Sequence, residues 1–138
     1  MTPDIVRIRK NWARAIAARE IIGRVFYENL FRIAPDTRAL FPDTLDEQGR
    51  KLVQTLSWIV DNLDNADDLV AGAEALAVRH VGYGVKPEQY TAVGTALIAT
   101  LQAGLGEDFS AADEAAWVRV YTGLSQSMIK AAYPEPAA

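Results

Sequence analysis

The chain has 138 residues, half of them apolar, and 14 basic against 18 acidic side chains give it a formal charge of −4. This length and composition suit one compact domain, expected over residues 1–138, with a single apolar core. The mild acidity and the lack of a dense basic run argue against nucleic acid or an anionic membrane as a partner. Because the sequence contains no cysteine, it can form no disulfide, thiolate metal site or cysteine nucleophile.

Neither an export signal nor a membrane span is expected. The first residues, MTPDIVRIRK, are charged where a signal peptide needs an apolar stretch. One long uncharged run, Tyr90 to Gly106, contains three threonines, a glutamine and three glycines. It is also shorter than the roughly 20 apolar residues that cross a bilayer. We therefore expect a buried helix in this run, no membrane association and a cytoplasmic location.

The first half of the chain has the periodicity and the end signals of helices. Thr2 is a suitable N-cap, and Pro3 suits the first helical position, where its missing N–H costs nothing. Pro35 should end the second helix, because the residue before a proline avoids the α-helical region. The helices expected here span 3–18, 20–34 and 47–63, with a short helical turn at 35–41.

The second half of the chain continues in the same way. The sequence GYGV breaks one helix, and Pro87 suits the first turn of the next. Ser110 followed by Asp113 resembles a capping box with acidic groups at the proper end of the helix dipole. No segment alternates apolar and polar residues as a half-buried strand would, so the predicted fold class is all-α, with six long helices and a short one. The helices expected here span 66–81, 87 to about 104–108, and 111–132, followed by a frayed tail at 133–138.

His80 is the only histidine of the chain, and it lies in line with an apolar stripe on its own helix. Leu69, Ala73 and Leu76 form this stripe at helical spacing, so the imidazole should face the interior. It is then either a buried core histidine bonded to a carbonyl or an axial ligand of a buried cofactor. The small side chains of Ala73 and Ala77 would leave room for a flat ligand. The pattern alone favours the core histidine, which is the commoner case.

Two more polar side chains should point inward. Gln48 is in register with the apolar stripe of the helix that follows it, and a buried amide needs a hydrogen-bond partner. It would either cap the start of that helix or project into a pocket. Tyr27 shares a helix face with Gly23 and Leu30, so its hydroxyl should also point inward, although a tyrosine at this spacing is more often a core residue.

Five short motifs follow one another along the chain. They are FYENLF at 26–31, P-x-x-x-x-LF at 35–41, Q-x-x-x-L at 48–52, RH…YGV…Y at 79–90 and W-x-x-x-Y at 117–121. In their order and spacing they resemble the globin family, most closely bacterial single-domain haemoglobins and the globin domain of flavohaemoglobins. The resemblance covers essentially the whole chain.

This resemblance implies a globin fold around a haem pocket, with haem b (iron protoporphyrin IX) as the cofactor. His80 resembles the proximal iron ligand, and Phe41 resembles the phenylalanine that packs against the porphyrin. Tyr27, Gln48 and Leu52 resemble the distal pocket. Lys51, Arg79 and, more weakly, Tyr83 are candidates to bind the haem propionates, and the alternative is that they are ordinary solvated surface groups. The other side chains expected at the haem are Leu56, Leu76, Val85, Tyr90, Val93 and Leu97.

Three departures from the family pattern limit the expected chemistry. The chain ends where the globin domain ends, so we expect no reductase domain in it. Ala132 stands where flavohaemoglobins carry a glutamate that joins Tyr90 and the proximal histidine, so peroxidase-like chemistry is in doubt. With no second histidine, the ferrous iron should be five-coordinate, and a sixth ligand other than water would be something unusual, such as Tyr27 or Lys51.

The expected function is reversible binding of dioxygen, for transport, storage or sensing, with carbon monoxide and nitric oxide as further diatomic ligands. Hydrogen bonds from Tyr27 and Gln48 to the partly negative outer oxygen would each contribute on the order of 1 kcal/mol or more, which implies high affinity. The alternative is a nitric oxide dioxygenase that uses ferrous-oxy haem and a separate reductase. The pattern leaves open whether the protein is an enzyme. A third possibility, an interaction module that has lost haem, is disfavoured by the retained His80 and Phe41.

Overall fold

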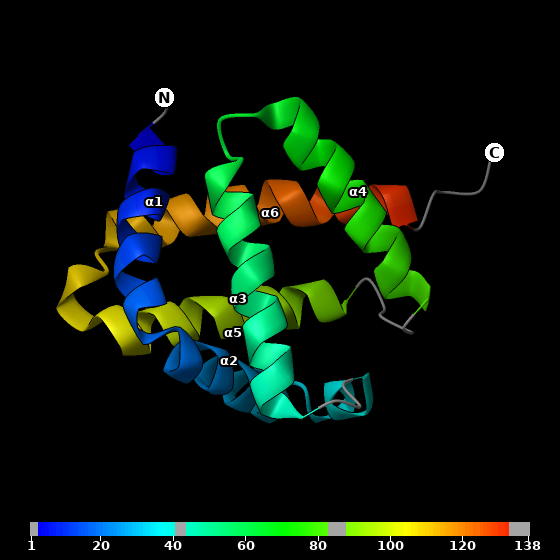
Figure 1. Ribbon diagram of the computed structural model, residues 1–138, viewed down its shortest axis with the longest axis horizontal. Coiled ribbons are helices and arrows are strands. Elements are labelled where there is room, and N and C mark those ends of the chain that lie inside the picture. The colour runs from blue at the N-terminus through cyan, green and yellow to red at the C-terminus, as the bar shows by residue number, and fades with distance from the viewer. Residues whose placement is uncertain (1–2, 41–43, 83–87, 133–138) are drawn as a thin grey trace.

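The computed structural model of the protein describes residues 3–40, 44–82 and 88–132, and within this part every regular element is a helix. This confirms the all-α prediction. Figure 1 shows the helices in two layers that cross each other. The α-helices are α1 Pro3–Ala15, α2 Arg19–Ile33, α3 Leu45–Asp61, α4 Ala66–Gly82, α5 Gln89–Leu105 and α6 Ala111–Ala132, and the short 3₁₀ turns are η1 Ile16–Ala18, η2 Pro35–Leu40 and η3 Gly106–Asp108.

Several helix ends differ from the sequence-based expectation by one to three residues, and two of them have a clear physical cause. The first helix ends at Ala15 and tightens into η1, because Ala18 leaves the helical region with φ −117° and ψ 40°. The third helix begins two residues earlier than expected, at Leu45, because Thr44 caps it. The hydroxyl of Thr44 accepts a hydrogen bond of 3.3 Å from the Glu47 N–H, a capping interaction that our reading of this loop missed.

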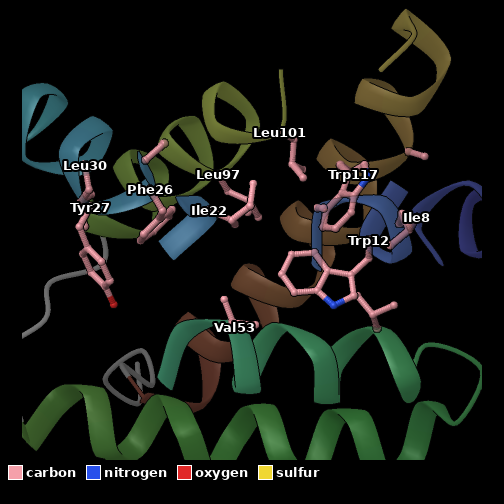
Figure 2. Close-up of a cluster of buried hydrophobic side chains, with 14 residues drawn as sticks. Ile8, Trp12, Ile22, Phe26, Tyr27, Leu30, Val53, Leu97, Leu101 and Trp117 are labelled. Atoms are coloured by element: carbon pink, nitrogen blue, oxygen red, sulfur yellow. The ribbon is translucent and has the colours of Figure 1, made fainter. Parts of the chain in front are cut away.

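The main apolar core lies where α2 crosses α3 and α5 and where α1 meets α6. Figure 2 shows Phe26 and Leu97 at the centre of this cluster and the indoles of Trp12 and Trp117 at one end. The Trp12 ring N–H donates to the Ser57 hydroxyl of α3 at 3.0 Å, which fixes α1 against that helix. A second, smaller cluster joins α4 to α5 and α6 and contains Ala73, Ala77, Tyr90 and Met128.

A buried polar network joins α1 to α6. The Trp117 ring N–H donates to the side-chain oxygen of Asn11 at 3.0 Å, and the Asn11 amide donates to Asp113 at 3.4 Å. Asp113 also accepts from Arg7 at 3.2 Å and from the Ser110 N–H at 3.0 Å. The Ser110 hydroxyl in turn accepts from the Asp113 N–H at 3.1 Å, so the two residues form the predicted capping box of α6.

The Asp113 carboxylate is held ionised by this network. Burial alone would raise its pKa, but the hydrogen bonds from Ser110, Arg7 and Asn11 together outweigh burial and lower the pKa below its usual value. A group whose pKa is lower in the folded state contributes stability above its unfolded pKa and loses it as the pH falls through the folded pKa.

None of the helices in the described part of the chain is both long and apolar enough to span a membrane. The uncharged run that begins at Tyr90 forms α5, which is covered by α2 and α6.

Replacing Asp113 with asparagine should lower the free energy of unfolding most at neutral pH, because the hydrogen bonds that lower the pKa of Asp113 stabilise its ionised form. The difference from the wild type should shrink as the pH falls below about 4, where the unfolded-state carboxyl becomes protonated. Urea unfolding curves at a series of pH values measure this difference. Asp108→Asn is the control, since its ion pair with Arg14 is exposed and should contribute little. An equal effect of Asp113→Asn at pH 7 and pH 3 would contradict the assignment.

Candidate functional site

An apolar cavity of about 190 Å³ lies between α3, α4, α5 and α6. Its walls are mostly aliphatic, and the chain elements that bound it are far apart in sequence. Six side chains that the sequence placed at the cofactor line this cavity, namely Leu52, Leu56, Leu76, Tyr90, Val93 and Leu97.

Helix α3 presents two apolar faces, and one of them supplies most of its contribution to the cavity. Val53 and Val60 are buried in the main core, and of the two only Val60 also borders the cavity. Leu52, Leu56 and Ile59 lie on the neighbouring face, stay half-buried and line the cavity. The stripe recognised in the sequence is thus the cavity wall, whereas the face that anchors the helix was not predicted.

Helix α4 closes the cavity from the other side. Its inner face carries Ala73 and Ala77, which pack against Tyr90 and Met128. His80 belongs to α4, one turn after Leu76, which lines the cavity. The side chain of His80 lies outside the described residues, and so do Phe41, Tyr83 and Val85.

Tyr90 is fixed by a residue of the last helix. The hydroxyl of Tyr121 donates a short hydrogen bond to the backbone carbonyl of Tyr90, and its ring packs directly over Gly94. Burial, reinforced by the nearby Tyr90, raises the pKa of Tyr121, so its hydroxyl remains a donor at neutral pH. The W-x-x-x-Y motif therefore positions α5 along the cavity.

Tyr27 is buried, and its ring is held between two other aromatic rings. It makes an edge-on contact with Phe26 at 5.0 Å between centroids and a tilted contact with Phe31 at 5.8 Å. Its hydroxyl donates to the backbone carbonyl of Gln48 at 3.4 Å and points out of the core cluster (Figure 2). Burial raises the pKa of Tyr27 to about 12, so the hydroxyl keeps its proton at neutral pH.

The position of Gln48 depends on a close contact between two helices. Gly23 of α2 and Gly49 of α3 meet so closely that a Cβ on Gly23 would lie 2.7 Å from the Gly49 Cα. Gln48 directly precedes this contact, is half-buried in the first turn of α3 and donates its backbone N–H to the Thr44 carbonyl at 3.0 Å. The structure thus brings Tyr27 and Gln48 together, although neither lines the cavity itself.

Two of the three predicted propionate partners lie at the surface. Lys51 is exposed on α3, and Arg79 is exposed on α4. Arg79 borders a second, more open cavity of about 370 Å³ between α3, α4 and α6. Among the described residues there is no group of three or more His, Cys, Asp or Glu side chains that could hold a metal ion.

Several cavity residues were missed by sequence reasoning. Leu124 and Met128 of α6 line both cavities, and Thr55 of α3 lies between them. A signal was present, because Trp117, Tyr121, Leu124 and Met128 follow one another at intervals of four, three and four residues, as one face of a helix does.

Comparison with known proteins places the chain in a defined group. The family model described as Globin matches residues 24–128. A flavohemoprotein of Rhodopirellula baltica is 32% identical over 111 residues, which are 78% of this chain and 27% of that protein. A flavohemoprotein of Rhizobium meliloti is 31% identical over 105 residues, 72% of this chain and 26% of that protein. The chain spans about a quarter of the length of these curated relatives.

Solved structures agree in fold. A double mutant of myoglobin from Aplysia limacina is 25% identical and superposes with a TM-score of 0.83 over 94% of this chain and 96% of that chain. A hexacoordinated heme protein from an anhydrobiotic tardigrade, 18% identical, has a TM-score of 0.86 over 96% of this chain and 95% of its own.

The close contact between Gly23 and Gly49, where α2 crosses α3, can be tested by substitution. Gly23→Ala should lower the free energy of unfolding by about 1–3 kcal/mol, because the added methyl must push the two backbones apart. Gly123→Ala on α6 is the matched control. Its new methyl meets nothing within 4 Å, so it should stabilise the helix by about 0.5–1 kcal/mol. Urea unfolding measures both, and equal effects of the two changes would show that the contact is not tight.

Proposed function

The chain belongs to the globin family, and from this premise we propose that it binds haem in the apolar cavity and binds dioxygen reversibly at the haem iron. The observation that carries the proposal is that six of the side chains predicted at the cofactor line one cavity. These six residues come from α3, α4 and α5, and α4 also carries the only histidine of the chain.

The chemistry of the cavity fits a porphyrin. Aliphatic side chains such as Leu56, Val93 and Leu97 would cover its faces and exclude water, while exposed Lys51 and Arg79 could bind the carboxylates at its edge. The volume is smaller than the roughly 300–1,000 Å³ of common ligand pockets, so binding would require side chains of α3 or α4 to move apart. Phe41, Tyr83 and Val85 belong to the proposed set by resemblance.

His80 is proposed to hold the iron. It is the only imidazole in the chain, and its helix faces the cavity through Leu76. When bound, haem supplies a ferrous iron with one position open to a diatomic ligand. Tyr27 does not compete for this position at neutral pH, because burial keeps its hydroxyl protonated. The ferrous iron would then be expected to have no second side-chain ligand, because the chain has no second histidine.

Tyr27 and Gln48 are proposed as donors to the bound ligand. The present bond from the Tyr27 hydroxyl to the Gln48 carbonyl, at 3.4 Å, is long for an O–H···O bond, so exchanging it for a bond to a ligand costs little. Leu52, next to Gln48 on the cavity face, would keep water from competing for the same donors.

A second candidate function is nitric oxide dioxygenation with a separate reductase. The flavohemoprotein relatives favour this function. They match this chain over about a quarter of their own length. Rapid mixing of the reduced, dioxygen-loaded protein with nitric oxide would give stoichiometric nitrate in either case. Sustained turnover with an added reductase would support the enzyme, and the absence of turnover would support dioxygen binding.

The proposed haem b and the cytoplasmic location stay predictions.

The absorption spectrum of the purified protein, supplemented with haem and reduced, tests the main proposal. A Soret band with a five-coordinate ferrous form and a stable air-exposed form is expected. Colourless protein after supplementation would overturn haem binding.

His80→Ala should abolish stable haem retention, because no other imidazole is present to replace the ligand. The measurement is the Soret absorbance that remains after gel filtration. Addition of free imidazole should restore part of the ferrous spectrum if only the ligand was lost. A wild-type spectrum of the variant without imidazole would mean that another residue holds the iron.

Tyr27→Phe should speed dioxygen release more than Gln48→Leu. Tyr27 is held by Phe26 and Phe31, whereas Gln48 lies in a first helical turn and is only half-buried. Loss of a well-placed donor should cost roughly 1.5–3 kcal/mol, or about ten- to a hundredfold in the release rate. Stopped-flow dissociation measures both variants, and the reverse order would contradict the assignment.

A further inference from the structure

We propose that Arg38 is a positioning residue for the bound diatomic ligand, because its guanidinium group packs over Phe31 and Phe31 keeps the Tyr27 ring in place. This role rests on the proposed function, since it assumes that the Tyr27 hydroxyl donates to the ligand. Arg38 belongs to η2 and is exposed, and it was not among the residues expected at the cofactor.

Three contacts in series join Arg38 to Gln48. The guanidinium carbon of Arg38 lies 5.3 Å from the centroid of the Phe31 ring, within the range of a cation–π interaction. The Phe31 ring lies 5.8 Å from the Tyr27 ring and is tilted by 34° against it. The Tyr27 hydroxyl then donates to the Gln48 carbonyl at 3.4 Å. Because this last bond is long, the packing of the ring carries a large share of the hydroxyl's orientation.

Of the two rings that hold Tyr27, Phe31 has more freedom to move. Phe26 is 3% exposed and lies inside the core cluster beside Tyr27 (Figure 2). A ring in such a close-packed interior has little room to change its position. Phe31 is half-buried at the edge of the cluster, so solvent reaches part of it. The guanidinium group of Arg38 therefore restrains the more mobile of the two neighbours of Tyr27.

The backbone of η2 is tied to two helices and holds Arg38 at this place. Thr37, the preceding residue, is buried, and its hydroxyl donates to the Ala34 carbonyl at the end of α2 at 2.7 Å. The Gln89 amide of α5 donates to the Asp36 carboxylate at 3.3 Å. Arg38 thus starts from a fixed backbone, and its planar guanidinium group can stack on an aromatic ring as an ammonium group cannot.

Loss of this guanidinium group should speed the release of dioxygen. With Phe31 less restrained, the Tyr27 hydroxyl would point at the ligand for a smaller fraction of the time. A cation–π contact at an exposed site is weak, so we expect the release rate to rise about two- to fivefold in Arg38→Met. The rise should be smaller in Arg38→Lys, which keeps the charge and loses the planar group.

Arg32→Met is the matched control. Arg32 is exposed on α2, directly after Phe31 in sequence, and its guanidinium group donates to the Asn29 side chain at 2.9 Å. The control removes one positive charge near the same helix end and should leave the release rate unchanged. An equal acceleration in Arg32→Met would show that the loss of charge is responsible, and it would overturn the proposal.

Stopped-flow release of dioxygen from the reduced haem protein measures these rates, and a double mutant shows whether Arg38 acts through Tyr27. In Tyr27→Phe the hydroxyl is absent, so adding Arg38→Met should change the release rate no further. If the two effects multiply instead, Arg38 acts independently of Tyr27, and the positioning role is wrong.

A second readout does not depend on ligand release. In NMR spectra of the diamagnetic carbon monoxide complex, nuclear Overhauser effects between the Phe31 and Tyr27 rings should weaken in Arg38→Met and stay unchanged in Arg32→Met. Unchanged effects in both variants would mean that Arg38 does not hold these rings.

Failure of this role and failure of the proposed function give different results. An unchanged release rate in Arg38→Met, together with faster release in Tyr27→Phe, would overturn the positioning role and leave haem binding intact. Unchanged release in Tyr27→Phe would overturn the donor role of Tyr27 and the role of Arg38 with it. Loss of the Soret band in the wild type would overturn the proposed function as a whole.

Discussion

At the crossing of α2 and α3, the backbones of Gly23 and Gly49 touch, and most of the site depends on this contact. It fixes how deeply α3 sits against α2, which in turn decides which face of α3 packs and which face borders the cavity. Val53, one turn after Gly49, is buried by the crossing, while Leu52 beside it is turned to the cavity. A side chain at either glycine would separate Tyr27 from Gln48, since each lies next to the contact on its own helix.

The same crossing explains how a residue in a first helical turn can take part in a binding site. Helix ends fray because their groups lack partners. Here the Thr44 cap and the α2 backbone both hold the first turn of α3. Gln48 therefore gains order from tertiary contacts rather than from its own helix. Tyr27 gains order differently, from aromatic neighbours on its own helix, and this difference gives the two side chains unequal freedom.

The fold class and the existence of all six long helices were predictable, because their apolar periodicity and proline signals are local. The cavity wall on α3 was also predictable as a stripe of Leu52, Leu56 and Ile59. What could not be predicted was that Val53 and Val60 would be the most deeply buried apolar side chains of α3, because their burial depends on how α3 crosses its neighbours. Leu124 and Met128 were missed for a similar reason. An apolar stripe indicates that a helix face is buried, but it does not indicate which neighbouring element covers that face.

The buried network between Asn11, Asp113 and Trp117 has a consequence for the order in which the chain folds. Its partners are more than 100 residues apart, with separations of 102 and 106. During synthesis α1 leaves the ribosome before α6, so the Asn11 side chain lacks its α6 partners until that helix follows. Until then α1 can pack through Ile8 and Trp12 on whatever apolar surface is available, but it cannot satisfy Asn11 in a buried position. The final docking of α1 therefore follows the synthesis of α6, and a chain that lacks α6 should leave Asn11 without these two partners.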